Sequence, residues 1–308
     1  MNWVKMQETH DCIYSVVDYH AITTPFKPEE LRRDTRDMLV DLLATGLDPE
    51  KCALVVQSEL PQHTELAWIL GSITPLGWLE RVPTYKEKAS MHPDYLNLGL
   101  LSYPVLMASD ILVYRAEAVP VGEDQLPHLE LTREIVRRFN HWFGDTFPEP
   151  EAIMKKETAR IMSLKEPEKK MSKSLGEDSY IGIGDDPETI HAKIKRAVTD
   201  MGPDSTAMGP GVANLFNLLQ IFGQEADYLT LYEDYETGSL RYVDLKTVTA
   251  DAIIEGLRPI REKRKEIKSN PEILENALQL GHEKASAMAT KTLSRVKERI
   301  GVGRDVNI

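Results

Sequence analysis

Short apolar runs alternate with longer helical segments through the first half of the chain, and this alternation constrains the fold more than any other feature. The runs at 12–17, 53–57 and 118–121 are short and apolar, as buried strands are. Helical patterns separate and follow them at 28–46, from His63 onward, at 98–114 and at 126–139. Strands joined by helical crossovers predict an α/β fold with a doubly wound parallel sheet, whose ligands lie beyond the carboxyl ends of the strands.

The second half of the chain contains helical patterns only. From about Asp185 they cover 187–198, 212–222, 245–268 and 271–300. The glycine-rich run 182–184 separates the two patterns. We therefore expect an α/β ligand-binding domain at 1–184 and an all-helical domain at 185–308.

Charge limits the partners of the chain. A net charge of -12 over 308 residues opposes wholesale nonspecific binding to nucleic acid. The run Arg258–Lys268 nevertheless holds six cations and two anions. A solvated helix face with Glu–Lys pairs is the favoured interpretation of this run, and a local footprint on RNA is the alternative.

The cysteines and the apolar segments predict a cytoplasmic protein. Cys12 and Cys52 lie in apolar runs without zinc-ligand spacing, so we expect reduced core residues. The start of the sequence lacks the pattern of a secretory signal. The segment 98–114 is short for a membrane span and contains Pro104 and Asp110, which indicates a buried helix and no membrane contact.

One face of the helix at 98–114 mixes aromatic, thioether and carboxylate groups. Tyr103, Met107, Asp110 and Tyr114 follow one another at steps of four, three and four residues, which places them on that face. A carboxylate on an apolar helix must find donors, because burying it unpaired costs several kcal/mol. It either caps a neighbouring loop or accepts a hydrogen bond from an aromatic ligand.

Two further segments carry candidate ligand contacts. Gly122-Glu123-Asp124-Gln125 follows a predicted strand, where glycine lets a ribose approach and the polar side chains can bind hydroxyl or amino groups; a generic strand-to-helix turn is the alternative. Lys170-Met171-Ser172-Lys173-Ser174 places two lysines three residues apart. Such a loop can neutralise charge on a departing pyrophosphate, although solvated basic loops are common.

The pentapeptide at 170–174 resembles the second signature of class I aminoacyl-tRNA synthetases. Further segments are similar to bacterial tryptophanyl-tRNA synthetases and follow in the same order over nearly the whole chain, at 18–23, 103–112, 119–125, 128–133 and 160–164. The resemblance implies the class I Rossmann-like fold with a helical domain that reads the tRNA anticodon.

The resemblance also implies a role for each matched residue. Asp110 matches the acceptor of the indole N–H and Met107 packs on the ring, while Tyr103, Gln125 and His20 match residues near the amino acid. The matches to adenosine and phosphate contacts are Gly122, Glu123, Asp124, Ile161, the loop Lys170, Met171, Ser172, Lys173 and Ser174, and Lys88.

The implied reaction has two steps. L-tryptophan attacks the α-phosphorus of ATP with Mg2+, pyrophosphate leaves, and the adenylate acylates tRNA(Trp). The resemblance implies no tightly bound metal and a homodimer, to which the helix 126–139 is a candidate contributor. Two alternatives stay open: a tyrosine-tRNA ligase, and a non-catalytic paralogue that binds tRNA or a protein partner.

The sequence departs from this family at its beginning. Members open with a strand, a Gly-x-Gln-Pro-(Thr/Ser)-Gly turn and a His-x-Gly-Asn-like tetrad, and these 308 residues do not contain them. We expect that Met1 is not the natural start. A doubly wound sheet without its interior first strand has two strands with unpaired edges, and it lacks the helix N-terminus that holds ATP phosphates.

Overall fold

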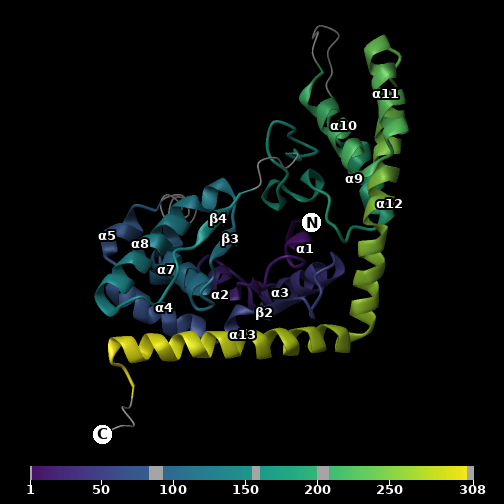
Figure 1. The fold of residues 1–308 in the computed structure, drawn as a ribbon. Helices are drawn as coiled ribbons and strands as arrows, with labels where there is room; N and C mark the ends of the chain where they lie inside the picture. The colour runs from purple at the N-terminus through teal and green to yellow at the C-terminus, as the bar shows by residue number, and fades with distance from the viewer. Residues whose placement is uncertain (1, 83–92, 155–159, 200–207, 304–308) are drawn as a thin grey trace. The chain divides into compact units, whose positions relative to one another are not determined.

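The computed structural model describes residues 2–82, 93–154, 160–199 and 208–303 (Figure 1). Its contacts divide the chain into two compact units. Unit 1 comprises 1–42, 46–156 and 271–308, and unit 2 comprises 43–45 and 157–270. Among the described helices, none is long and apolar enough to cross a bilayer.

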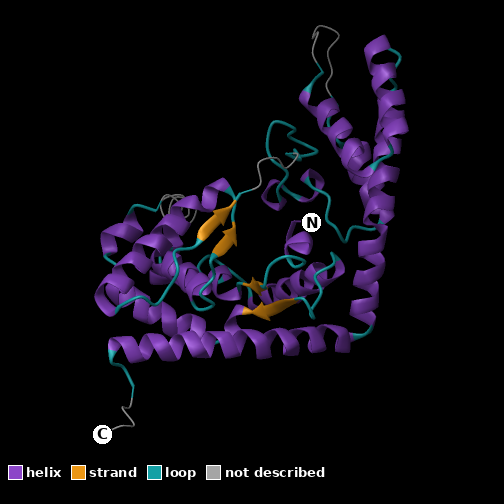
Figure 2. Cartoon of the chain, in the orientation of Figure 1, coloured by secondary structure: helices purple, strands orange, loops and turns teal. Residues whose placement is uncertain are grey.

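Unit 1 contains all the described strands, and Figure 2 shows them among its helices. Its strands are β1 (Cys12–Val16), β2 (Cys52–Val56), β3 (Ala118–Pro120) and β4 (Glu151–Ile153). Its α-helices are α1 (Asn2–Met6), α2 (Asp18–Ala21), α3 (Pro28–Ala44), α4 (Gln62–Ile73), α5 (Leu76–Glu80), α7 (Leu98–Leu112), α8 (Leu126–Phe143) and α13 (Pro271–Ile300).

Unit 2 is helical. It contains α9 (Pro187–Arg196), α10 (Pro210–Phe222), α11 (Glu225–Thr237) and α12 (Tyr242–Ser269), preceded by a loop region with single 3-10 turns. The sequence pattern missed α11, because only Leu231 of this helix is fully buried. The helix packs instead through Tyr228, Tyr232 and Tyr235, whose rings lie against Phe216 of α10.

The strands form two parallel pairs rather than one continuous sheet. β1 pairs with β2, in register from Cys12 opposite Cys52 to Val16 opposite Val56, and β3 pairs with β4. Within the described ranges no ladder joins the two pairs. The parallel α/β class is confirmed.

Local signals explain the helix ends. α3 starts at Pro28 and stops before Gly46, whose φ is +108°. The side chain of Asn97 caps α7 by accepting a hydrogen bond from the Leu100 N–H at 2.9 Å. Asp186 caps α9 by accepting from the Thr189 N–H. Cys12 and Cys52 are buried free thiols, as expected, and burial raises the pKa of Cys52 to about 11.

The division into units differs from the expected boundary near 182–184. Residues 160–184 pack with unit 2, since Leu164 belongs to the same hydrophobic core as Ile190 and Leu245. The helix α13 packs with unit 1, because it runs along β2 and α4 and places Ala289, Leu293 and Val296 in their core (Figure 1). Periodicity could not predict this return, because it is set by contacts between residues far apart in the chain.

The close approach of α13 to β2 depends on Gly281. A Cβ atom at this position would lie 2.1 Å from the Leu54 carbonyl oxygen, which is backbone of β2. No side chain can move to relieve that overlap. Only glycine therefore allows the helix to lie at this distance from the strand.

We predict that Gly281→Ala lowers the free energy of unfolding by about 1–3 kcal/mol, because the helix must move away from β2. Gly71→Ala in α4 is the matched control, since a Cβ there meets nothing within 4 Å and the added helix propensity is favourable. Urea unfolding followed by circular dichroism measures both. Equal midpoints for the two variants would contradict the packing argument.

Candidate active site

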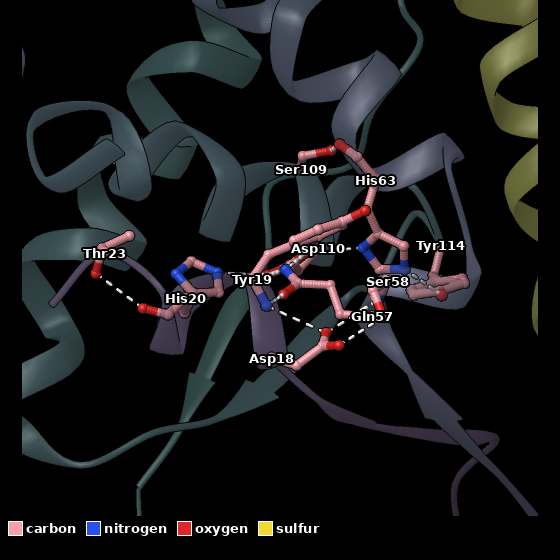
Figure 3. A network of polar contacts seen from close by, with 10 residues as sticks. All are labelled: Asp18, Tyr19, His20, Thr23, Gln57, Ser58, His63, Ser109, Asp110 and Tyr114. Atoms are coloured by element: carbon pink, nitrogen blue, oxygen red, sulfur yellow. Dashed lines mark hydrogen bonds and ion pairs between the residues drawn. The ribbon is translucent and has the colours of Figure 1, made fainter. Parts of the chain in front are cut away.

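The carboxyl ends of β1 and β2 are tied together by reciprocal hydrogen bonds. Asp18 follows β1 and accepts from the backbone N–H and the hydroxyl of Ser58, which follows β2. In the other direction, Gln57 Oε1 accepts from the Tyr19 N–H at 3.1 Å. The four residues therefore hold the two strand ends in one arrangement (Figure 3).

Asp110 is the centre of a polar network within unit 1, shown in Figure 3. Its carboxylate lies in the last turn of α7 and its side chain is 13% exposed. Gln57 Nε2 donates to both of its oxygens at 2.8 and 2.9 Å. His63 Nδ1 lies 2.6 Å from Oδ1, and His20 Nε2 lies 2.9 Å from Oδ2. Three elements thus converge on one carboxylate.

The network favours the ionised form of Asp110. Burial raises the pKa of this carboxyl, but the hydrogen bonds from His20 and His63, and their charge, act in the opposite direction and together hold it below its usual value. A carboxylate only accepts hydrogen bonds, so His63 donates from Nδ1. The Asp110 side chain is therefore a fixed, partly buried acceptor.

The second ring nitrogen of His63 connects the network to Tyr114. His63 Nε2 lies 2.7 Å from the Tyr114 hydroxyl, and when Nδ1 alone carries the ring hydrogen this nitrogen accepts a hydrogen bond from the hydroxyl. Burial, and then the charge of Asp110, raise the pKa of Tyr114, so the hydroxyl keeps its proton. The tyrosine consequently fixes the orientation of His63 and, through it, that of Asp110.

Tyr103 and Met107 lie on the same helix as Asp110. The Tyr103 hydroxyl lies 2.7 Å from Nε2 of the buried His128, and the Tyr103 ring meets the His20 ring edge-on with centroids 6.0 Å apart. Met107 is partly buried against the core of unit 1. The predicted face of α7 therefore combines an ionised acceptor with aromatic and thioether surface, as an aromatic ligand bearing one donor requires.

The segment 122–125 follows β3, as the sequence predicts. Gly122, Glu123 and Asp124 are exposed, and Gln125 Nε2 donates to Asp124 Oδ2 at 2.8 Å. A Cβ atom on Gly122 would lie 2.8 Å from Asp124 Oδ1. The bare Gly122 backbone is therefore what leaves room for the Asp124 carboxylate in this turn.

The signature loop belongs to unit 2. Its first two residues pair with an earlier segment: Met162 and Lys170 form an antiparallel bridge, and the Met171 N–H donates to Ile161 O at 3.1 Å. The Ser172 hydroxyl caps a 3-10 turn at Lys173–Leu175. Lys170 and Lys173 are exposed, while Met171 packs on the core of unit 2. The methionine anchors the loop and leaves both lysines in solvent.

Asn214 of α10 holds the strand that carries Ile161 and Met162. Its side chain is 4% exposed, accepts from the Met162 N–H at 3.0 Å and donates to the Met162 carbonyl at 2.9 Å. One amide thus satisfies both backbone groups of a residue in the loop region. The segment that pairs with the start of the signature loop is therefore held by α10, a helix of the same unit.

Several site residues were missed by the sequence analysis. Asp18, Gln57 and His63 were not singled out, although two of them directly follow strands, which is the signal that would have found them. His63 lies inside α4 and gave no such signal. The predicted Lys88 lies outside the described residues.

The basic run Arg258–Lys268 forms part of α12, and several of its cations are paired along the helix. Arg258 bonds to Glu255 and Glu262 at 3.1 and 3.3 Å, and Lys263 bonds to Glu266 at 2.9 Å. These pairs are those expected of a solvated, charge-paired helix face.

Comparisons with known proteins show the family of the chain. The model of the family tRNA synthetases class I (W and Y) matches residues 1–258. The chain therefore belongs to this family of class I aminoacyl-tRNA synthetases. Within the family, the tryptophan--tRNA ligase of Clostridium tetani is 45% identical over 304 residues, covering 97% of this chain and 89% of that protein. That of Clostridium perfringens is 43% identical over 305 residues, covering 98% and 91%.

Solved structures show the same fold. The crystal structure of tryptophanyl-tRNA synthetase from Campylobacter jejuni, complexed with ADP and tryptophan, has a TM-score of 0.88 at 32% identity and covers 98% of this chain and 93% of that chain. A tyrosyl-tRNA synthetase from Archaeoglobus fulgidus, complexed with L-tyrosine, has a TM-score of 0.60 at 21% identity. The latter likeness concerns the fold alone.

We predict that Asn214→Ala destabilises unit 2 by about 1–3 kcal/mol, because it leaves the backbone N–H and C=O of Met162 without their partner. Asn217→Ala on the exposed side of the same helix is the control, since its single contact with Arg160 O is long, at 3.4 Å. Urea unfolding and limited proteolysis of the loop region measure the effect. Similar protease sensitivity of both variants would refute the role of Asn214.

Proposed function

We propose that the chain activates L-tryptophan with ATP to tryptophanyl-adenylate and transfers the tryptophan to tRNA(Trp). The observation that supports this most directly is the ionised Asp110, a partly buried acceptor on α7 beside Tyr103 and Met107. An indole ring offers one N–H donor on an otherwise apolar body, which matches such a surface. The identities of 42–45% to tryptophan--tRNA ligases agree with the assignment.

Discrimination follows from the same carboxylate. Asp110 is fixed by Gln57, His20 and His63, so a ligand that displaces one of these donors without supplying its own leaves part of the charge unsatisfied. Sites built around such an acceptor reject analogues that lack the donor far more strongly than they reject analogues that differ only in size. Phenylalanine, which has no donor on its ring, is excluded on this basis.

We assign the remaining predicted residues to the two substrates. His20, Tyr103 and Gln125 contact the amino acid, and the turn Gly122–Asp124 together with Ile161 contacts the adenosine. The lysines of the loop, Lys170 and Lys173, and Lys88 stabilise charge on the pyrophosphate that leaves from Mg-ATP. Catalysis then rests on orientation and electrostatic stabilisation, and no side chain becomes covalently modified.

The partner RNA and the cell compartment follow from the same proposal. We assign anticodon recognition to the helical region 185–308, with the run Arg258–Lys268 as a candidate contact. The region 1–184 then carries the chemistry. The protein works in the cytoplasm, where its two cysteines remain reduced.

Tryptophan-dependent exchange of pyrophosphate into ATP tests the function. Asp110→Asn is expected to raise the KM for tryptophan about 10- to 100-fold, because it removes one hydrogen bond to a charged acceptor. Lys173→Ala is expected to lower kcat about 100-fold with little change in that KM. Lys169→Ala is the control, because Lys169 lies next to the loop but forms an ion pair with Glu166 and is not assigned to the pyrophosphate.

The same assay separates the alternatives. It is run on the 308 residues and on a form extended by the N-terminal segment that the family carries. Exchange with tyrosine alone would support the tyrosine ligase. Absence of exchange with every amino acid in the extended form would support the non-catalytic paralogue and exclude the proposed function.

We also propose a homodimer, as the resemblance implies. Most apolar side chains of α8, the helix considered for this role, are buried in the core of unit 1, and of its large apolar residues only Trp142 is exposed, at 51%. Three large apolar residues of unit 1 are instead well exposed: Trp68 at 83%, Leu98 at 78% and Leu76 at 58%. Exposed apolar surface of this kind is typical of interfaces.

We predict that Trp68→Lys shifts the chain toward the monomer in analytical ultracentrifugation at micromolar concentration, because a charge would be buried without a partner. Leu229→Lys on α11, where the leucine is 58% exposed, is the control. A wild-type chain that sediments as a monomer would remove the dimer proposal.

A further inference from the structure

A basic surface lies within unit 1 and shares only Tyr114 with the candidate active site. A cavity of about 960 Å³ opens between α13 and the residues that follow α7 and end α8. Its lining includes Tyr114 and Arg115 after α7, Phe143 at the end of α8, and Lys291, Arg295 and Arg299 on α13. The two α13 arginines and Lys291 come from successive turns, so they form one row.

The charge of this lining opposes that of the chain. Four cations and one carboxylate, Glu298, line the cavity, whereas the whole chain carries -12. Across the part of the chain that the structure describes, none of these four cations takes part in an ion pair. Arg295 donates to the backbone carbonyl of Asp145 at 2.8 Å, which fixes its guanidinium without neutralising it. The cavity therefore keeps a local positive charge.

Arg115 occupies this surface at a conformational cost. Its φ is +53°, and it is the only non-glycine residue with positive φ among those described. The Arg115 N–H bonds to Leu112 O and the Ala116 N–H bonds to Ile111 O, the pattern of a helix end whose left-handed residue is usually glycine. An arginine there costs of order 1 kcal/mol relative to glycine. Retaining a cation at a position that favours glycine points to a use for its charge.

Stabilisation of helix ends explains only part of this arrangement. Arg299 lies in the last turn of α13, where a cation interacts favourably with the helix dipole. Lys291 lies more than two turns before that end and gains little, because the effect is confined to the last turn. Arg115 could serve the end of α7, but a glycine would end that helix without strain.

We infer that this cavity binds the phosphodiester backbone of RNA, and we take the tRNA substrate of the proposed function as its source. Guanidinium groups match phosphate oxygens in a bidentate manner, and the Tyr114 and Phe143 rings supply surface on which a base or ribose can lie. Arg115, Lys291 and Arg299 are exposed. A pocket for a small nucleotide buries most of its ligand. These exposed cations are therefore better suited to an RNA backbone that passes over the surface.

Binding of a fluorescently labelled tRNA(Trp) transcript, measured by anisotropy as a function of salt, tests the inference. The double variant Arg115→Asn with Lys291→Gln removes two cations, and asparagine tolerates the left-handed backbone at 115. We expect about tenfold or greater weakening at 0.1 M salt. The slope of log K against log salt is expected to fall by about two.

The matched control removes two exposed cations elsewhere in unit 1, with Arg32→Gln and Arg36→Gln on α3. Circular dichroism melting shows whether each variant is folded. The single variant Lys291→Gln, at an exposed position, gives a second estimate of the loss of RNA affinity. A double variant that binds the transcript like the wild type, or no more weakly than the control, would overturn the inference. Displacement of the transcript by tripolyphosphate at equal phosphate concentration would also overturn it, in favour of a small-anion site.

Tryptophan-dependent pyrophosphate exchange, which needs no tRNA, is measured on the same preparations. We expect the double variant to keep the wild-type exchange rate, because neither position belongs to the candidate active site. Absence of exchange in all proteins, each also prepared with the N-terminal extension, would remove the proposed function, while the anisotropy result would still decide whether the cavity binds RNA.

Discussion

The ionised carboxylate of Asp110 is the interaction on which the candidate site depends. It lies on α7, yet its donors come from α2, from the end of β2 and from the first turn of α4. A partly buried charge is tolerated only when its lone pairs are satisfied, so these elements must meet in one arrangement. Because Gln57 also accepts from the Tyr19 backbone, the same network that orients Asp110 fixes the ends of the first strand pair. Fold and site are therefore linked through one side chain.

The loop lysines are positioned by a different means. Their segment has little regular structure, and it is held by the Met162–Lys170 bridge, by the hydrophobic contact of Met171 and by the Asn214 amide. These contacts hold the Lys170 backbone, the Met171 side chain and the Met162 backbone, and they do not involve the lysine side chains. Lys170 and Lys173 consequently remain exposed and able to rearrange around phosphate, which suits a loop that stabilises charge developing on a leaving group.

The return of α13 to unit 1 gives the C-terminal segment a role in both packing and charge. Gly281 lets the helix approach the β2 backbone, and Ala289, Leu293 and Val296 extend the core of α4, α7 and α8. The opposite flank of the helix presents Lys291, Arg295 and Arg299 to the basic cavity. Tyr114 lines that cavity and bonds to His63, so the basic surface and the Asp110 network share a residue.

The sequence by itself determined the alternation of strands and helices, the positions of Asp110 and the signature loop, and the family, because periodicity and short motifs are local properties. It also predicted the parallel α/β class, whereas the division into β1–β2 and β3–β4 pairs is seen only in the structure. The helix α11 was missed because its packing face is made of tyrosines, which carry a weak apolar period.

Only the tertiary structure decided which residues surround Asp110, where α13 packs and that residues 160–184 belong to the helical unit. His63 is 47 positions from Asp110 and Gln57 is 53, and nothing in the local pattern of either residue records the pairing. Such contacts form because long-range packing brings buried donors to a buried acceptor, and the cost of leaving that acceptor unpaired selects the arrangement.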